Sequence, residues 1–149
     1  MGKIYSINTS AAKGVPKENV RSAVLVKGHG IQDDAHAGMP IRQVSLLDME
    51  SVRLQIADAA AKKATVRIRP GIYAENITTE GVELAALKIG DRLRLGSTAI
   101  LQISKIGKEC HQHCAIYHQV GDCIMPRKGI FAEVLEGGEI QTGDSVEKI

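Results

Sequence analysis

The chain has 149 residues, a typical length for one compact domain, and we expect a single domain over 1–149. Its net charge is only +2, its lysines and arginines are dispersed, and aromatic residues make up 3% of it, which argues against a nucleic-acid surface. Because no apolar run approaches the ~20 residues that span a bilayer and the N-terminal segment lacks the apolar core of a signal peptide, we expect a cytoplasmic protein without a membrane segment.

The first half of the chain alternates short apolar runs with glycine-rich loops. Residues 3–8, 22–26 and 42–47 are predicted to be strands, the last two of them buried. Residues 27–40 hold three glycines, a proline, two aspartates and two histidines, which indicates a loop rich in groups that bind or titrate. A helix is predicted over 49–64, because apolar residues recur there at helical spacing behind an aspartate suited to an N-cap, and this apolar stripe is expected to pack on the core.

The second half carries stronger strand signals. Residues 91–103 alternate apolar and polar side chains on both sides of a Gly-Ser turn, which predicts a β-hairpin. Residues 83–87 are expected to form one helical turn, 128–138 a short helix capped by glycine, and 145–149 a closing strand. Short strands, frequent glycine turns and one principal helix together predict a mostly β domain, a barrel or strongly curved sheet with a few short helices.

All three cysteines and three of the five histidines lie in one stretch, residues 108–126. Within it Cys110 is the predicted nucleophile, because the thiolate is the reactive form of cysteine and the neighbouring lysines and histidines would lower the pKa of this thiol. Clustered cysteine and histidine also suit borderline metals, so a zinc-binding or thiol-sensing module is a second interpretation. A redox pair of Cys110 with Cys114 or Cys123 is a third, and a small buried apolar cysteine without chemistry is the fourth.

Several segments resemble, in the same order, the MOSC domain, the family named after the C-terminal domain of molybdenum cofactor sulfurases. They are GIQDDAHAG (30–38), RQVSLLDME (42–50), RPGIYAENITTEGVEL (69–84), LKIGDRLRLGSTAIL (87–101), Cys110 one strand later, and the closing GIFAEVLEGGEIQTGDSV. One departure stands out: Gln32-Asp33-Asp34 stands where many members have a Gly-Asp pair, which favours a role for Asp34 over one for Asp33. The cluster CHQHC is also richer than the single cysteine of the family, as in a short stand-alone bacterial branch.

This resemblance implies a barrel-like, mostly β fold and an association with molybdenum cofactor and sulfur transfer. It implies that Cys110 carries sulfur as a persulfide or ligates molybdenum, with a cysteine desulfurase or a molybdenum enzyme as the partner. Some relatives support reduction of N-hydroxylated compounds, which gives a further alternative, weakened by the expectation of a single domain without a partner domain for electron delivery.

The resemblance also singles out residues for binding molybdopterin. Arg42, Arg69 and Asn76 lie in the shared segments, and arginine suits a phosphate because its planar fork donates two hydrogen bonds at once. Asp34 and His36 lie in the loop 30–38 and complete the expected cofactor site. Purely structural roles stay open: Arg42 as a solvated strand start, Asn76 as a turn residue and His36 as a residue that orders its own loop.

Overall fold

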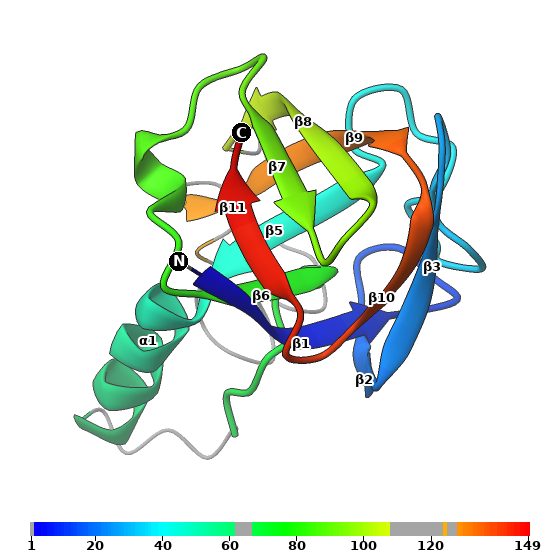
Figure 1. Ribbon diagram of the computed structural model, residues 1–149. Coiled ribbons are helices and arrows are strands. Elements are labelled where there is room, and N and C mark those ends of the chain that lie inside the picture. The colour runs from blue at the N-terminus through cyan, green and yellow to red at the C-terminus, as the bar shows by residue number, and fades with distance from the viewer. Residues whose placement is uncertain (1, 62–66, 108–123, 125–127) are drawn as a thin grey trace.

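A closed β-barrel forms the centre of the molecule. The computed structural model describes residues 2–61, 67–107, 124 and 128–149. The barrel strands are β1 (Gly2–Thr9), β5 (Val44–Asp48), β6 (Ile77–Glu80), β7 (Arg92–Leu95), β8 (Ala99–Ile106), β9 (Ile130–Glu136) and β11 (Ser145–Lys148). They follow one another in the order β11, β7, β8, β9, β5, β6 and β1, and β1 pairs back onto β11 (Figure 1). The barrel-like, mostly β fold expected from the sequence is therefore confirmed.

Short additional strands flank the barrel. β2 (Glu18–Val20) pairs with the far half of β1, and β10 (Gly138–Gln141), β3 (Ser22–Val26) and β4 (Gly30–Ile31) form a separate small sheet. The prediction that 22–26 is a buried strand was right about the strand and wrong about its burial. Only Leu25 is buried, whereas Val24 and Val26 are exposed, because this small sheet turns one face to solvent.

The inside of the barrel is filled by aliphatic side chains. Alternate residues of each strand point inward, as the pleat of a β-strand requires. The inner set includes Ile4, Ile7, Leu46, Ile77, Leu93, Leu101, Ile103, Ala132 and Val134. A one-turn helix, η1 (Leu84–Ala86), adds Leu84 to this core. The apolar filling makes the barrel interior a core rather than a ligand-binding site.

A second apolar cluster lies outside the barrel wall. It consists of Leu47, Met49, Val52, Ile68, Ile72, Tyr73, Ala74, Ile124 and Phe131, and we call it the outer cluster. Leu46 points into the barrel and Leu47 into the outer cluster, so β5 is buried on both faces. This double burial explains why the residues of β5 read as a nearly continuous apolar run.

The helix α1 (Met49–Ala61) follows β5 and begins the crossover to β6, which runs parallel to β5. Its N-cap is Asp48, whose Oδ2 accepts hydrogen bonds from the N–H and the hydroxyl of Ser51 at 2.9 and 2.7 Å. Residues 62–64 of the predicted helix lie outside the described residues. None of the described helices is long and apolar enough to cross a membrane.

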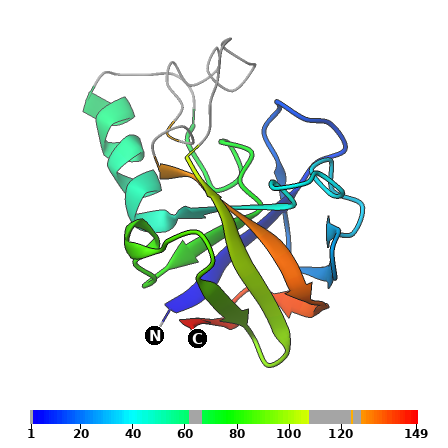
Figure 2. The same cartoon turned by 90° about the horizontal axis from the view of Figure 1, so that it is seen from above.

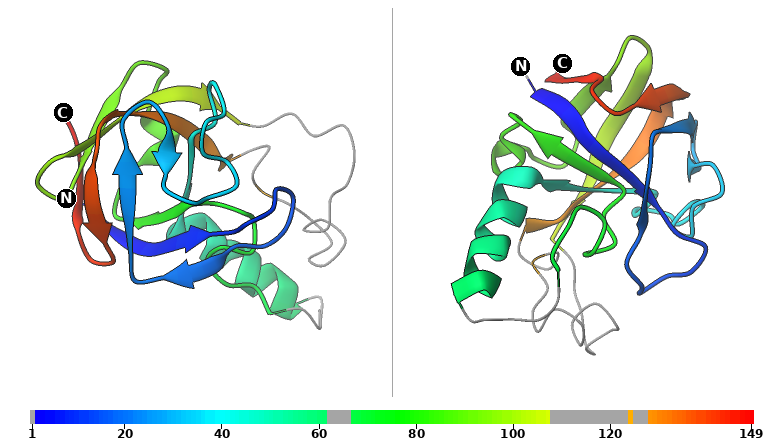
Figure 3. Two further views of the ribbon diagram at one scale, coloured as in Figure 1. Left: turned by 90° about the vertical axis from the view of Figure 1, so that its right-hand side faces the viewer. Right: turned by 90° about the horizontal axis from the view of Figure 1, so that it is seen from below.

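The expected apolar stripe of this helix packs only in part. Met49 and Val52 are buried, but Ile56 is exposed, because most of α1 extends away from the barrel wall (Figure 3). Ala59 packs against the outer cluster, so the expectation of a core-packing stripe is confirmed at Met49, Val52 and Ala59 and wrong at Ile56.

The helical turn at 83–87, the hairpin at 91–103 and the closing strand are confirmed as η1, β7–β8 and β11. The helix predicted over 128–138 is wrong: most of that stretch is β9, paired with both β8 and β5. Alanine, glutamate and leucine favour helix locally, but the barrel closes only if this segment is extended, and the tertiary pairing prevails.

Candidate functional site

A buried ion pair joins two loops at one end of β5. Lys17 Nζ lies 2.8 Å from Asp34 Oδ1, and both side chains are 0% exposed. The ammonium also donates to Ser10 Oγ at 2.9 Å, and the Ser10 N–H donates to Asp34 Oδ1 at 3.1 Å. Figure 2 shows the two loops side by side, the one after β1 and the one between β4 and β5. Two loops distant in sequence are therefore locked together by one carboxylate.

The charge state of Asp34 follows from these contacts. Burial by itself raises the pKa of a carboxyl, but the hydrogen bonds from His36 and Lys17 and the positive charge of Lys17 outweigh it, and Asn76 adds a further hydrogen bond. The pKa of Asp34 is consequently held well below its usual range. Asp34 is thus an ionised carboxylate throughout the physiological pH range.

His36 is held against the same carboxylate. Its backbone N–H donates to Asp34 Oδ2 at 3.0 Å, and its ring Nδ1 lies 3.7 Å from that oxygen. The side chain is 10% exposed, and within the described part of the chain Nδ1 has no hydrogen-bond partner. The carboxylate therefore fixes the loop that carries the imidazole and faces the ring itself.

The backbone of Lys17 anchors the segment that carries Arg69. The Lys17 N–H donates to the Gly71 carbonyl at 2.8 Å, and Arg69 Nη1 donates to the Lys17 carbonyl at 2.8 Å. Gly71 has a φ of +93°, and a Cβ there would lie 2.6 Å from the Lys17 oxygen, so only glycine allows this approach. Lys17 thus links Arg69 to Asp34: its backbone carbonyl binds Arg69, and its side-chain ammonium binds Asp34.

Asn76 ties the same segment to the barrel wall. Its Oδ1 accepts hydrogen bonds from the N–H and the hydroxyl of Ser45 at 2.9 and 3.1 Å, and its Nδ2 donates to the Asn8 carbonyl at 3.2 Å. The residue is 0% exposed. Both ends of the amide therefore bridge β5 and β1, and Asn76 lies behind the accessible surface.

Glu75 is a second buried carboxyl in this framework. Its Oε2 accepts a hydrogen bond from Thr78 Oγ1 at 2.9 Å, and its backbone carbonyl accepts one from Asn8 Nδ2 at 3.0 Å. Burial raises the pKa of Glu75, and hydrogen bonds from backbone N–H groups, including that of Gly71, offset the rise only in part. The surroundings of Glu75 therefore favour its neutral form.

Arg42 lies apart from the Lys17–Asp34 pair. Its guanidinium carbon stands 5.6 Å above the ring centroid of Phe131, a cation–π contact at the edge of the outer cluster. The outer cluster also holds Ile68, close to Arg69 in sequence, and Ile124, which directly follows Cys123. The outer cluster thus contacts Arg42 and contains the residue before Arg69 and the residue after Cys123.

The structure brings together four of the predicted site residues: Asp34, His36, Arg69 and Asn76. Arg42 contacts the outer cluster instead. Cys110, predicted as nucleophile and metal ligand, lies outside the described residues, as do the other two cysteines. Among the residues that the structure does describe, no group of histidine, cysteine, aspartate and glutamate is arranged to hold a metal ion.

Sequence reasoning missed Lys17, Asn8, Ser45 and Glu75. Lys17 lies in a polar loop where nothing predicts a fully buried ammonium. Asn8 and Ser45 lie within strands, where their neighbours signal only burial. Glu75 belongs to the Glu-Asn-Ile segment that resembles the MOSC pattern, so it was the one residue of the four with a usable signal.

The protein is therefore a seven-stranded β-barrel with a polar site at one edge, and the loops around β5 and β6 build that site. The family model of the MOSC domain matches residues 33–147, and the chain belongs to the MOSC domain family. Members of this family are associated with molybdenum cofactor and the sulfurases that modify it. No curated protein matches the chain.

Solved structures share the fold. The YuaD protein of Bacillus subtilis superposes with a TM-score of 0.77 at 21% identity, covering 98% of this chain and 94% of YuaD. YiiM of Escherichia coli gives 0.72 at 18% identity, covering 100% of this chain and 70% of YiiM. YiiM of Geobacillus stearothermophilus gives 0.71 at 19% identity, with 100% and 75% covered. At these identities the likeness establishes the fold.

Proposed function

We propose that this protein binds molybdenum cofactor and takes part in sulfur transfer through Cys110. The observation that carries the proposal is the role of Lys17, which joins Arg69 to Asp34 and His36 in one constellation at the barrel edge. Three residues that the family resemblance assigns to one cofactor site are thereby connected through Lys17, whose backbone carbonyl binds Arg69 and whose ammonium binds Asp34 in the loop of His36. When bound, the cofactor would supply a molybdenum centre that accepts or exchanges sulfur.

Arg69 is the proposed anchor for the cofactor phosphate. Two backbone carbonyls, of Lys17 and Pro70, hold its Nη1, and its side chain is 34% exposed. Its Nη2 lies 3.6 Å from the carboxylate of Glu18, which is 84% exposed. A phosphate would replace this solvated carboxylate at little cost, because an exposed ion pair contributes under about 1 kcal/mol. An oriented guanidinium is well suited to bind such an anion.

The remaining predicted residues have different tasks in this proposal. Asp34 and Asn76 are enclosed by hydrogen bonds and fix the framework, while the imidazole of His36 and the guanidinium of Arg42 are left to face the cofactor. The residues that would hold an anionic cofactor are thus two arginines and one histidine, Arg69, Arg42 and His36, whose side chains suit a negative charge.

Sulfur transfer through Cys110 requires one nucleophilic displacement. The Cys110 thiolate attacks the terminal sulfur of a persulfide on a cysteine desulfurase, a new S–S bond forms, and the donor S–S bond breaks. The donor cysteine leaves as a thiolate, so the terminal sulfur moves without an external oxidant or reductant. The step needs access and a low thiol pKa, which the lysines and histidines around Cys110 in sequence favour.

The sulfur-transfer arm of the proposal is tested by mass spectrometry. The protein is incubated with a cysteine desulfurase and cysteine, as wild type and as Cys110→Ser, Cys114→Ser and Cys123→Ser. We expect an added sulfur atom in every form except Cys110→Ser. A persulfide that persists in Cys110→Ser and disappears in one of the other two variants would place the acceptor elsewhere, and no persulfide in any form would refute a sulfur carrier.

The cofactor arm is tested by binding of molybdopterin to Arg69→Gln, Arg42→Gln and the matched control Arg21→Gln, which changes an exposed arginine of the small-sheet side. Loss of one charge-assisted hydrogen-bonding group should weaken binding about tenfold or more for Arg69→Gln. Arg21→Gln should bind like wild type. Equal affinities of Arg69→Gln and Arg21→Gln would show that the phosphate does not bind at Arg69.

A further inference from the structure

A cavity of about 580 Å3 lies at the end of β5 opposite to the loop that carries Asp34. It is open to solvent on one side and lined by the first turn of α1, the chain between β6 and η1, the last residue of β8, and residues 128–130 at the start of β9. Cavities of roughly 300–1,000 Å3 are the usual size of small-molecule sites. None of the residues around the Lys17–Asp34 pair lines it, so it is a separate site.

The apolar part of the wall comes from three elements. Val82 and Leu84 come from the chain around η1, Ile106 ends β8 and Ile130 begins β9. Ile106 is 50% exposed and so presents apolar surface to the cavity. An apolar group bound in the cavity would cover it, and burial of apolar surface is the main source of affinity in such sites.

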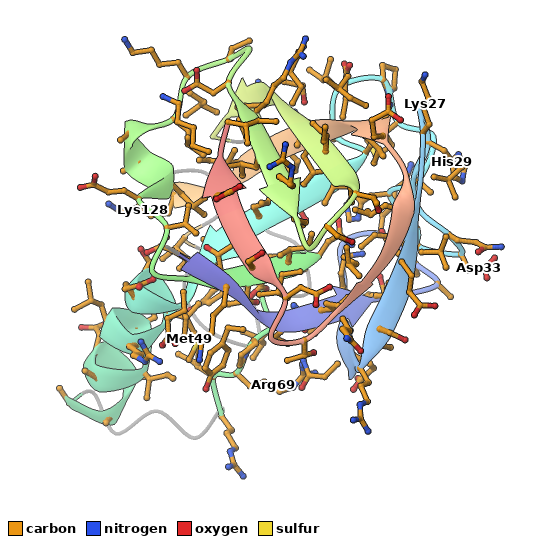
Figure 4. The ribbon with its side chains drawn as sticks, viewed as in Figure 1. Lys27, His29, Asp33, Met49, Arg69 and Lys128 are labelled. Carbon is orange, nitrogen blue, oxygen red and sulfur yellow. The ribbon has the colours of Figure 1, made fainter. Side chains whose placement is uncertain are left out.

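The charged part of the wall is mostly negative. Three carboxylates line the cavity, those of Asp48, Glu50 and Glu83, against one ammonium, that of Lys128. Figure 4 shows Lys128 on the same side of the molecule as Met49, the first residue of α1. The described lining residues therefore carry a net charge of −2 (three negative charges and one positive) in a protein whose net charge is +2.

Two of these carboxylates are held in place. Asp48 Oδ2 accepts the two hydrogen bonds from Ser51, and Glu50 Oε2 accepts one from the Gly81 N–H at 2.9 Å. Their positions are set by the cap of α1 and by the turn after β6, so a ligand would not have to order them. A preorganised charge costs less conformational entropy on binding than a free one.

We propose that this cavity binds a small organic cation, an alkylammonium whose apolar body covers Ile106 and whose ammonium meets the carboxylates of Asp48, Glu50 and Glu83. The negative wall repels anions, so the phosphate-bearing cofactor is the wrong ligand for it. The carboxylates select a positive charge, and the aliphatic side chains select an unbranched or compact apolar body. This site is independent of the cofactor function proposed above.

The test is an NMR titration of the full chain with hexylammonium, using hexan-1-ol and hexanoate as probes of the same length and different charge. We expect hexylammonium to shift the amide signals of Gly81, Ile106 and Gly129 and to bind at least about fivefold more tightly than hexan-1-ol, with hexanoate weakest. Equal affinity of the three probes, a preference for hexanoate, or the absence of these shifts at millimolar hexylammonium would overturn the proposal.

Variants identify the charge that selects the probe. Glu83→Gln removes a carboxylate that makes no side-chain cap hydrogen bond to η1 among the described residues, and it should weaken hexylammonium binding about threefold to fivefold, whereas Lys128→Gln should strengthen it. Glu139→Gln, at an exposed position on β10, is the matched control and should bind like wild type. Equal weakening by Glu83→Gln and Glu139→Gln would show only a general charge effect and would also overturn the proposal.

Discussion

Asp34 and Glu75 are buried carboxyl groups in the same framework, and their surroundings favour opposite charge states. Asp34 meets a buried ammonium, whereas Glu75 accepts its side-chain hydrogen bond from the neutral hydroxyl of Thr78. Burial raises the pKa of both groups, but within the described part of the chain only Asp34 is paired with a cation that reverses the effect. The comparison teaches that depth of burial alone does not decide ionisation, and that Lys17 sets the charge of this site.

The largest expected effect comes from removing that cation. Lys17→Met keeps the length of the side chain and leaves the carboxylate of Asp34 buried without its counter-ion, which should lower the free energy of unfolding by about 3–5 kcal/mol. Urea denaturation measures this loss. The double variant with Asp34→Asn should lose less than Lys17→Met alone, because no unpaired charge is left; losses that simply add would contradict the ion pair.

Neutral replacements of the two carboxyls should differ at pH 7. Asp34→Asn leaves the Lys17 ammonium buried without its partner and should cost about 3 kcal/mol. Glu75→Gln replaces a group whose neutral form is already favoured, and it should change stability by about 1 kcal/mol or less. Thermal unfolding of both variants gives the comparison. Similar losses would mean that Glu75 is held as a carboxylate by contacts as strong as those of Asp34.

The two groups should also give opposite pH dependence. The folded-state pKa of Asp34 is lowered, so its stabilisation is present above the unfolded-state value of about 3.9 and is lost as the pH falls below it. The folded-state pKa of Glu75 is raised, so its stabilisation is full below about 4.3 and is lost as the pH rises through the folded-state pKa. Stability curves from pH 3 to 8 should therefore show Glu75→Gln gaining on wild type as the pH rises, and a constant difference would contradict this.

The smallest expected effect concerns Asp33, the exposed neighbour of Asp34. It adopts a φ of +68°, the left-handed conformation that glycine favours, in the segment where many family members have a Gly-Asp pair. Asp33→Gly should relieve about 1 kcal/mol of backbone strain, of which the greater freedom of glycine in the unfolded chain cancels about half. The free energy of unfolding should rise by about 0.5 kcal/mol, and its decrease below pH 4 should match that of the wild type. This result would confirm that Asp34, not Asp33, causes the pH dependence below pH 4.

Elements whose local sequence pattern agrees with the tertiary structure were predicted correctly from the sequence. The hairpin β7–β8 follows from alternating apolar residues such as Leu93 and Leu95 around a turn at Gly96, and its register depends on residues close in sequence. The prediction that one site contains Asp34, His36, Arg69 and Asn76 came from the MOSC-like segments and their order. No local pattern around these residues indicates that they lie close together. The part of the site that depends on Cys110 remains a prediction.

The amino-acid sequence by itself determined the class of fold, the family and most of the strands, because β-strands and tight turns leave short-range patterns of alternation and glycine. Only the tertiary structure decided that residues 130–136 are a strand, since their helix-favouring composition is overridden when β8 and β5 need a partner between them. It alone also decided the burial of Lys17 and the opposite charge preferences of Asp34 and Glu75. The energy of a buried charge depends on the group that lies a few ångströms away in space, and the order of residues along the chain does not record that distance.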